Sequence, residues 1–305
     1  MHARNVHRAP YDFPRLVAAL SELARFVEPH PLAGDTVDFS NPAAVLTLNR
    51  ALLKLHYGIA HWDLPSGYLC PPIPSRADYL HYAADLLTDD APDSAPPRGN
   101  GIRALDIGTG ADCIYPLLGT SIYGWHFTAT DIDSESINWA HQLVTANPTV
   151  SRNIELRLQP STNSLFQNIA RSGESFALSL CNPPFHSSPE EAAAGTQRKL
   201  KNLHGIAPRR DTSMRLNFGG RANELWCPGG EVAFIRRMIA ESADPPRALR
   251  PVYDARLKAR QPPDPRTWIS NASASTISTS SRCSPGRRNE AALLTWTFLP
   301  GHWPE

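Results

Sequence analysis

The stretch Asn182-Pro183-Pro184-Phe185 constrains this chain more than any other part of it. It follows a short apolar run, residues 176–180, which is typical of a buried strand. The two prolines fix φ and remove two backbone donors, so the turn after the strand is stiff. The Asn182 amide and the Pro183 carbonyl then lie beside the flat ring of Phe185. These groups can together bind a planar amino group, for example the exocyclic amine of a nucleobase. The competing interpretation is that the stretch is only a proline-rich turn after a strand.

Strand and helix signals alternate around this turn, which predicts an α/β domain with a parallel sheet. The predicted strands are residues 102–106, 125–130, 154–158 and 176–180. The predicted helices among and after them begin at Cys113, Ser134 and Gly230. This order predicts a Rossmann-like core over residues 101–243, in which the proline-rich turn leaves the fourth strand.

Residues 1–88 are predicted to form a small helical module in front of this core. Its helices are expected from Pro14 to Val27, from Pro42 to Tyr57 and from Arg76 to Leu87. Pro14 and Asn41-Pro42 supply the signals for the first turns of two of them. Residues 89–100, rich in proline, aspartate and glycine, are expected to be a linker.

A second motif closes the first predicted strand of the core. Gly108 and Gly110 follow Asp106, so the backbone can pass close to a ligand. Ligands of open α/β sheets lie beyond the carboxyl ends of the strands, where Asp131 can accept both hydroxyls of a ribose. A dinucleotide site needs a third glycine, and Cys113 occupies that position. The pattern therefore favours a nucleoside cofactor without phosphates, of which S-adenosylmethionine is the common one.

Plainer interpretations of these residues stay open. Gly108 and Gly110 also suit a simple tight turn between strand and helix. Asp131 can be the N-cap of the next helix, in which case Asp133 holds the ribose or neither residue does.

Together the two motifs predict a methyltransferase that acts on an amino group. The adenine amine is a poor nucleophile because its lone pair is delocalised into the ring. Hydrogen bonds from its two hydrogens to Asn182 and to the Pro183 carbonyl would favour a tetrahedral nitrogen and stabilise its developing positive charge. Phe185 would stack on the base, which is worth roughly 1–3 kcal/mol. The base must be unstacked to enter such a site.

Charge and cysteine content limit the kinds of ligand and partner that the sequence predicts. The net charge is +1, so any basic surface must be local. The long segment 195–221 is the predicted phosphate-binding surface, because only Asp211 opposes its cations. These cations are Arg198, Lys199, Lys201, Arg209, Arg210, Arg215 and Arg221. Five cysteines without zinc spacing predict free thiols in a reducing cytosol and no metal site. The absence of a run of about 18 apolar residues predicts no membrane span.

Several strings of the chain are similar to those of a known family. They include Tyr68-Leu69-Cys70-Pro71-Pro72-Ile73-Pro74, Leu105-Asp106-Ile107-Gly108-Thr109-Gly110-Ala111-Asp112-Cys113-Ile114-Tyr115-Pro116, Asn182-Pro183-Pro184-Phe185 and Glu224-Leu225-Trp226-Cys227. With them, residues 1–242 resemble the RlmF family of bacterial large-subunit rRNA adenine N6-methyltransferases and its eukaryotic METTL16-type relatives. The resemblance implies a Rossmann-like, S-adenosylmethionine-dependent enzyme that methylates N6 of one adenosine in 23S rRNA in the cytoplasm.

The resemblance also implies residues of the site. Cofactor contacts are expected at Arg76, Asp106, Gly108, Gly110, Asp131, Thr162 and Asn182. RNA contacts are expected at Arg4, Arg8, Arg198, Lys199, Lys201, Arg209 and Arg210. Arg76 can also be an ordinary surface arginine, and Ser161 and Ser164 compete with Thr162. The enzyme is expected to act as a monomer.

Residues 244–290 depart from the family pattern. They contain seven prolines, seven serines and only seven large apolar residues, with no helix or strand period. A strand pattern returns at residues 293–298. The abrupt change predicts a compensated reading-frame shift in the coding sequence, and a disordered insert is the alternative. A frame shift would remove an internal strand and expose the edge of the fourth strand, while residues 291–305 would still supply the last strand and a tail.

Two other functions stay open from the sequence. A methyltransferase that acts on guanine amines in rRNA, or on a protein glutamine amide, would use the same kind of turn. A non-catalytic RNA-binding or assembly protein would fit a damaged C-terminal region.

Overall fold

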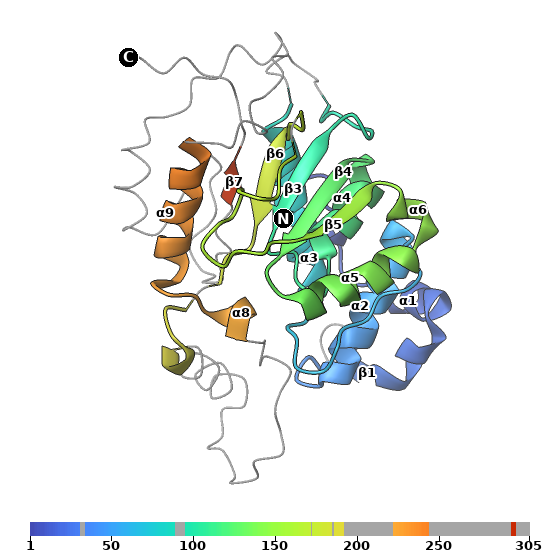
Figure 1. The fold of residues 1–305 in the computed structure, drawn as a ribbon. Helices are drawn as coiled ribbons and strands as arrows, with labels where there is room; N and C mark the ends of the chain where they lie inside the picture. The colour runs from blue at the N-terminus through green and yellow to red at the C-terminus, as the bar shows by residue number, and fades with distance from the viewer. Residues whose placement is uncertain are drawn as a thin grey trace.

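The computed structural model describes residues 1–30, 34–88, 95–171, 173–184, 186–191, 222–243 and 294–296. Its centre is a five-stranded sheet with the strand order β5-β4-β3-β6-β7 (Figure 1). The strands are β3 (Arg103–Ile107), β4 (His126–Asp131), β5 (Ile154–Leu158), β6 (Leu178–Cys181) and β7 (Leu294–Trp296). The first four are parallel and β7 is antiparallel to β6, which confirms the α/β fold class.

The strand order puts the switch point of the sheet between β3 and β6. The chain runs outward from β3 through β4 to β5 and then returns to the other side of β3. Ile107 at the end of β3 pairs with Thr130 on one side and with Cys181 on the other. The residues that follow these three therefore leave the sheet at one edge, where ligands of open α/β sheets bind.

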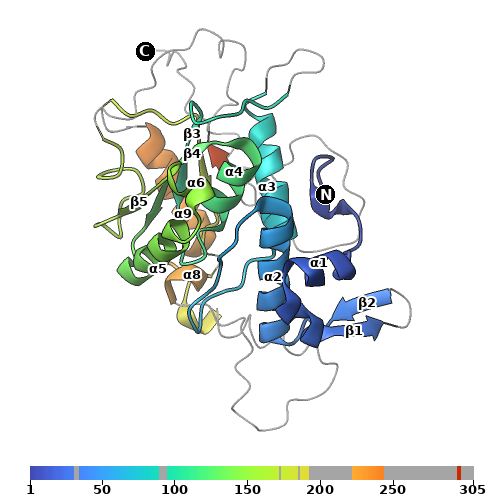
Figure 2. The same ribbon diagram turned by 90° about the vertical axis from the view of Figure 1, so that its right-hand side faces the viewer.

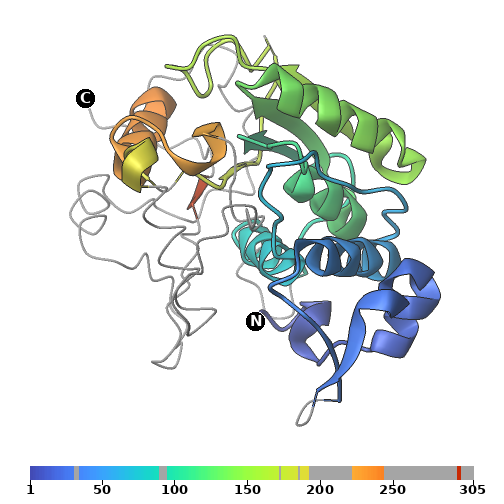
Figure 3. The same ribbon diagram turned by 90° about the horizontal axis from the view of Figure 1, so that it is seen from below.

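Helices cover both faces of the sheet (Figures 1 and 3). One face carries α2 (Pro42–Tyr57), α3 (Ile73–Asp85), α4 (Ile114–Tyr123) and α5 (Ser134–Thr145), which is followed by the short α6 (Pro148–Ser151). These helices share a large core with Ala104 and Leu178 of the sheet. On the other face Met238 of α9 (Gly230–Ala243) packs with Leu105 and Cys181 in a small separate core. Successive residues of a strand thus point to opposite faces of the sheet and pack into two cores of very different size.

The N-terminal part packs against α2, on the side away from the sheet (Figure 2). It consists of η1 (Val6–Arg8), α1 (Phe13–Ala19), η2 (Ser21–Phe26), β1 (Val27–His30) and β2 (Gly34–Val37). Phe13 and Leu23 belong to the same core as Phe127 of the sheet. The boundary expected at residues 89–100 stays a prediction, and residues 89–94 lie outside the described residues.

One predicted helix is wrong. The helix expected from Pro14 to Val27 ends at Ala19, because Leu20 is extended with φ −142° and ψ 95°. A 3-10 turn follows it, and the β-branched Val27 starts a strand. The break buries both Leu16 and Leu23 in the core. Leucines at this spacing suited either arrangement, so the apolar pattern alone did not distinguish them.

Other predicted elements are confirmed with shifted ends. The third helix begins at Ile73, which places Arg76 within its first turn. Asp133 rather than Ser134 caps α5, because its side chain accepts hydrogen bonds from the backbone amides of Glu135 and Ser136. The β1–β2 hairpin was not predicted. Among the helices of the described residues, none is long and apolar enough to cross a membrane.

The edge of β6 is not free. Its residues Ser179, Leu180 and Cys181 pair with Trp296, Thr295 and Leu294 of β7. In the described residues this edge is therefore covered by β7, which lies within residues 291–305, where the last strand was expected. Residues 244–290 lie outside the described residues, so the frame shift stays a prediction.

Candidate active site

The turn after β3 is held by backbone hydrogen bonds. The amides of Gly108 and Thr109 both donate to the Thr130 carbonyl, at 2.9 and 2.8 Å. Gly108 and Gly110 have φ values of 74° and 64°, where a side chain is costly. A Cβ on Gly108 would meet no atom within 4 Å, so bare backbone faces open space there. The glycines are needed for the turn, and the turn leaves room for a ligand against it.

Asp131 bridges the ends of β3 and β4. Its Oδ2 accepts a hydrogen bond from the Gly110 amide and its Oδ1 accepts one from the Asp133 amide, both at 2.9 Å. Asp133 is the helix cap, and its carboxylate also accepts a hydrogen bond from the Tyr68 hydroxyl at 3.2 Å. Of the two carboxylates that competed for the ribose, Asp131 is therefore the one that lies against the glycine turn.

Two further carboxylates stand beside this turn. Asp106 is 1% exposed, and neither of its oxygens has a hydrogen-bond partner among the described residues. Burial raises the pKa of Asp106 to about 7, with the charges of Asp112 and Asp131 adding to the rise and that of Arg76 opposing it. Burial likewise raises the pKa of Asp112 to about 6. This cluster is suited to a cation, whose charge would stabilise the ionised carboxylates.

The N-terminus of α4 is unsuited to a pyrophosphate. Asp112 Oδ1 accepts the hydrogen bond of the Ile114 amide at 3.0 Å, so a carboxylate already occupies one of the free helix donors. Cys113, at the position of the missing third glycine, takes the left-handed conformation with φ 49°. Its thiol is buried, and burial raises the pKa of that thiol. The geometry agrees with a cofactor that has no phosphate at this turn.

Asn182 joins the site from the other side of the switch point. It follows Cys181, whose partner Ile107 directly precedes Gly108. Its Oδ1 accepts a hydrogen bond from Arg76 Nη1 at 3.0 Å, and the same Nη1 donates to the Tyr115 hydroxyl at 2.9 Å. Three residues from α3, α4 and the end of β6 thus meet beside the glycine turn. Arg76 is not an ordinary surface arginine.

The loop after β5 reaches the same edge of the sheet. The backbone amide of Gln159 donates a hydrogen bond to the backbone carbonyl of Asp131 at 2.8 Å. Thr162 is exposed in the turn that follows, and its carbonyl accepts a hydrogen bond from Arg237 of α9 at 3.1 Å. No contact in the described residues joins Thr162 to the glycine turn, so its cofactor role stays a prediction.

The residues expected to contact RNA fall into three groups. Arg8 is exposed on η1. Arg4 instead binds Asp85 at 2.6 Å, the His81 carbonyl at 2.8 Å and the Tyr123 hydroxyl at 3.3 Å, so it fastens the N-terminus to α3 and α4. The basic residues Arg198, Lys199, Lys201, Arg209 and Arg210 lie outside the described residues.

Two residues were expected to act with Asn182 on the substrate amine. Pro183 is buried, and Phe185 lies outside the described residues.

Two residues of this site were not predicted. Tyr115 was named only as part of the string 105–116, which is similar to the family, and nothing in the sequence pattern indicated that its hydroxyl would belong to the site. Glu224 of α8 (Ala222–Leu225) accepts a hydrogen bond from the Leu69 amide at 3.3 Å. Its Oε1 lies 3.9 Å from the place of a Cβ on Gly110. Its carboxylate therefore faces the glycine turn from an element more than a hundred residues later in the chain.

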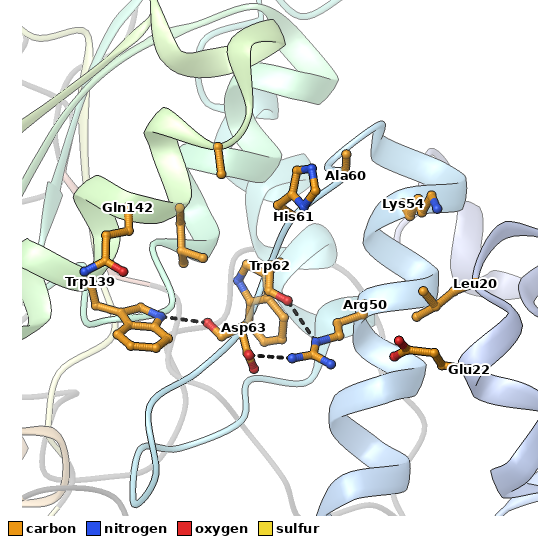
Figure 4. A pocket seen from close by; sticks show the side chains of 12 residues that line it. Leu20, Glu22, Arg50, Lys54, Ala60, His61, Trp62, Asp63, Trp139 and Gln142 are labelled. Carbon is orange, nitrogen blue, oxygen red and sulfur yellow. Dashed lines mark hydrogen bonds and ion pairs between the residues drawn. The ribbon is translucent and has the colours of Figure 1, made fainter.

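A hollow of about 370 Å³ lies elsewhere, between α2, η2 and α5 (Figure 4). Arg50 on its wall pairs with Asp63, and the Trp139 indole donates to the Asp63 carbonyl at 3.0 Å. Trp62 also lines the hollow, and its indole donates to the Asp112 carbonyl at 2.9 Å. None of the predicted site residues lines this hollow, so its size does not make it the active site.

Comparisons with known proteins agree with the fold and identify the family. A family model for RNA methyltransferases, Methyltransf_10, matches residues 1–299. Ribosomal RNA large subunit methyltransferase F of Ectopseudomonas mendocina (strain ymp) is 47% identical over 301 residues, which are 99% of this chain and 89% of that protein. The protein of the same name from Stutzerimonas stutzeri (strain A1501) is 53% identical over 242 residues, 79% of this chain and 73% of the relative.

Solved structures show the same relationship. The catalytic domain of human METTL16 in complex with the MAT2A 3′UTR hairpin 1 is 32% identical, with a TM-score of 0.62, and the match covers 82% of this chain and 79% of that one. The N-terminal domain of human METTL16 in complex with SAH is 28% identical, with a TM-score of 0.58 and coverage of 82% and 81%. The resemblance found in the sequence is confirmed: this chain belongs to the Methyltransf_10 family of RNA methyltransferases.

Proposed function

We propose that this chain transfers the methyl group of S-adenosylmethionine to N6 of one adenosine in the 23S rRNA of the large ribosomal subunit. The observation that carries the proposal is the meeting of two elements at the switch point. The bare glycine turn at Gly108 and the side-chain amide of Asn182 follow two residues, Ile107 and Cys181, that are paired in the sheet. Relatives named as large-subunit rRNA methyltransferases supply the class of substrate.

The residues present fit S-adenosylmethionine. That cofactor supplies an electrophilic methyl group on a sulfonium, together with a ribose and an adenine but no phosphate. Asp131 would accept the ribose hydroxyls, and the open space in front of Gly108 would receive the nucleoside. Asp106, buried without a hydrogen-bond partner among the described residues, would contribute the negative potential that a sulfonium favours. Arg76 would pair with the carboxylate of the methionine part of the cofactor.

Asn182 would act on the substrate amine. Its carbonyl oxygen has two lone pairs, so it can accept one amine hydrogen while Arg76 occupies the other. The Pro183 carbonyl would accept the second amine hydrogen, and the Phe185 ring would stack on the base. These contacts would hold the nitrogen in line with the methyl group and stabilise the charge it gains, after which a proton leaves to solvent.

RNA would reach this edge as an unstacked adenosine. Arg8 on the N-terminal part and the basic residues of segment 195–221 are the groups proposed to bind the phosphates. Sequence-specific recognition of RNA targets such exposed bases, because the major groove of an RNA helix is too narrow to read. We place the reaction in the cytoplasm and assign it to a monomer.

The test is methylation of 23S rRNA taken from a strain that lacks this activity. The purified chain and S-adenosylmethionine should convert one adenosine to N6-methyladenosine, located by mass mapping of rRNA fragments. Methylation of a guanine, or of a release-factor peptide offered in parallel, would replace the proposal with one of the competing enzymes. Loss of both methylation and S-adenosylhomocysteine binding in calorimetry would favour a non-catalytic RNA-binding protein.

A further inference from the structure

We propose that Tyr115 is a positioning residue that fixes Arg76 and, through it, the orientation of the Asn182 side-chain amide. The inference rests on the proposed function only for its kinetic consequence, because the orientation itself can be measured without RNA. Tyr115 lies on α4 and Asn182 after β6, so no element of local structure links them.

Arg76 is the link between them. Its Nη1 donates both to the Tyr115 hydroxyl at 2.9 Å and to Asn182 Oδ1 at 3.0 Å. The guanidinium carbon also lies 5.5 Å from the centroid of the Tyr115 ring, within the range of a cation–π contact. The phenol thus holds the guanidinium by its hydroxyl and by its ring, and the guanidinium holds the amide.

The Tyr115 ring is itself fixed. It is 5% exposed, and its centroid lies 4.9 Å from that of Tyr79, which is 6% exposed. Tyr79 and Arg76 are three residues apart on α3 and therefore lie on one side of that helix. The Tyr79 hydroxyl lies 3.4 Å from the carbonyl oxygen of Cys181, the residue before Asn182. Two packed phenols therefore brace both Arg76 and the end of β6.

The orientation of the amide decides what Asn182 offers to a substrate. Arginine has only donors, so it must face Oδ1 and not the Nδ2 group of Asn182. With this orientation the carbonyl oxygen stays beside the site and can accept a hydrogen from an amine. If the amide rotated by half a turn, a donor group would face the amine hydrogens and repel them. Burial raises the pKa of Tyr115, so its hydroxyl stays neutral and accepts the arginine hydrogen bond over the working pH range.

Tyr115→Phe tests the role of the hydroxyl while keeping the ring and its packing on Tyr79. The matched control is Tyr57→Phe, which removes another buried hydroxyl, one that is bound to His7 Nε2 at 2.8 Å and not to a residue of the site. We expect kcat for rRNA methylation to fall about tenfold in Tyr115→Phe, the usual effect of losing one hydrogen bond to a charged group. KM for RNA and the Kd for S-adenosylhomocysteine should stay within about twofold, and Tyr57→Phe should keep kcat.

A double-mutant cycle with Asn182→Ala separates positioning from general destabilisation. If Tyr115 acts through Asn182, Tyr115→Phe should lower kcat no further in the Asn182→Ala background. Additive losses would overturn the proposal, because they would show that Tyr115 acts on something else.

The direct readout is the side-chain amide signal of Asn182 in a ¹⁵N NMR spectrum of the RNA-free protein, assigned by its loss in Asn182→Ala. We expect this signal to move in Tyr115→Phe and in Arg76→Lys, which breaks the same link from its other side, and not in Tyr57→Phe. An unmoved signal in both variants would overturn the proposal. A shifted signal in a chain whose wild type fails to methylate rRNA would support the positioning role while rejecting the proposed function.

Discussion

The two halves of the active site are held in different ways. The half at the ends of β3 and β4 is built from backbone amides and the Asp131 carboxylate, within a few residues of two strands that border the large core. The half at the end of β6 depends on side chains from distant elements, such as Arg76, which is 106 residues from Asn182. The strand β6 also borders the large core through Leu178, but on its other face it shares the small core under α9, and its outer neighbour is the three-residue strand β7.

This difference separates two tasks of the enzyme. The glycine turn can bind the methyl donor with contacts that the local sequence supplies, so donor binding should survive damage to the β6 side. Presentation of the substrate amine needs the assembled α3, α4, β6 and α9, so it should be the first function lost when the tertiary structure loosens. Four measurements test this difference between the two halves.

Asn182→Ala should have the largest effect. The variant loses the amide that is proposed to accept an amine hydrogen, so kcat should fall roughly 100-fold or more. The Kd for S-adenosylhomocysteine, measured by calorimetry, should stay close to that of the wild type, because the glycine turn and Asp131 are unchanged. Equal turnover in the variant, or a matching loss of donor binding, would remove the proposed division of tasks.

Asp131→Asn should damage the opposite half. The loss of a charged acceptor should weaken donor binding about tenfold to a hundredfold in calorimetry. Asp133→Asn is the matched control, because it removes the same charge at the carboxylate that caps α5, and asparagine caps a helix about as well as aspartate, so both the melting temperature and donor binding should stay close to those of the wild type. A stronger binding defect in the control would mean that Asp133 holds the ribose.

Glu241→Ala should weaken the support of the β6 side. The Glu241 carboxylate accepts hydrogen bonds from the backbone amides of Leu165 and Phe166, at 2.8 and 2.9 Å, and so ties α9 to the loop after β5. Its loss should lower the free energy of unfolding by about 1–2 kcal/mol, measured from urea denaturation. The exposed Arg236 on the same helix provides the control Arg236→Gln, which should leave stability unchanged. Equal stability of the two variants would mean that α9 does not support this side.

The pH dependence of donor binding should show the smallest effect. Because the pKa of Asp106 is raised to about 7 and that of Asp112 to about 6, Asp106 becomes mostly protonated and Asp112 partly protonated as the pH falls from 8 to 6. The affinity for S-adenosylmethionine should therefore fall by about fivefold over this range, since its sulfonium loses negative partners. S-adenosylhomocysteine lacks the sulfonium and should show a flatter profile. Identical profiles for the two ligands, or no flattening in Asp106→Asn, would contradict this role of the carboxylates.

The local parts of the site could be predicted from the sequence. Gly108 and Gly110 need left-handed φ values that few other residues tolerate, and a proline pair after an apolar run specifies a stiff turn, so Asn182 was predicted at a strand end. Cys113 in place of a third glycine correctly argued against a dinucleotide. Leu20 shows the opposite case, because leucines at helical spacing also fit a helix broken by a 3-10 turn.

The contacts between distant segments could not be predicted in the same way. Nothing around Tyr115 marks its hydroxyl as the partner of Arg76, and nothing near Glu241 marks it as the acceptor for Leu165. The choice between Asp131 and Asp133 also depended on which carboxylate reached the Gly110 amide, since both residues follow the same strand. Each of these outcomes depends on how helices pack over the sheet, which side-chain pattern alone does not specify.

The chemical groups at the ends of the strands follow directly from the amino-acid sequence, because backbone conformation there depends on glycine and proline and hence on residue type. The family also follows from it, through strings long enough to be specific. Which side chains meet across the switch point depends instead on the folded chain, because Arg76, Tyr115 and Asn182 approach one another through the pairing of β3 with β6 and the packing of α3 on α4. Hydrogen bonds of about 3 Å tolerate little displacement, so this part of the site exists only in the assembled fold.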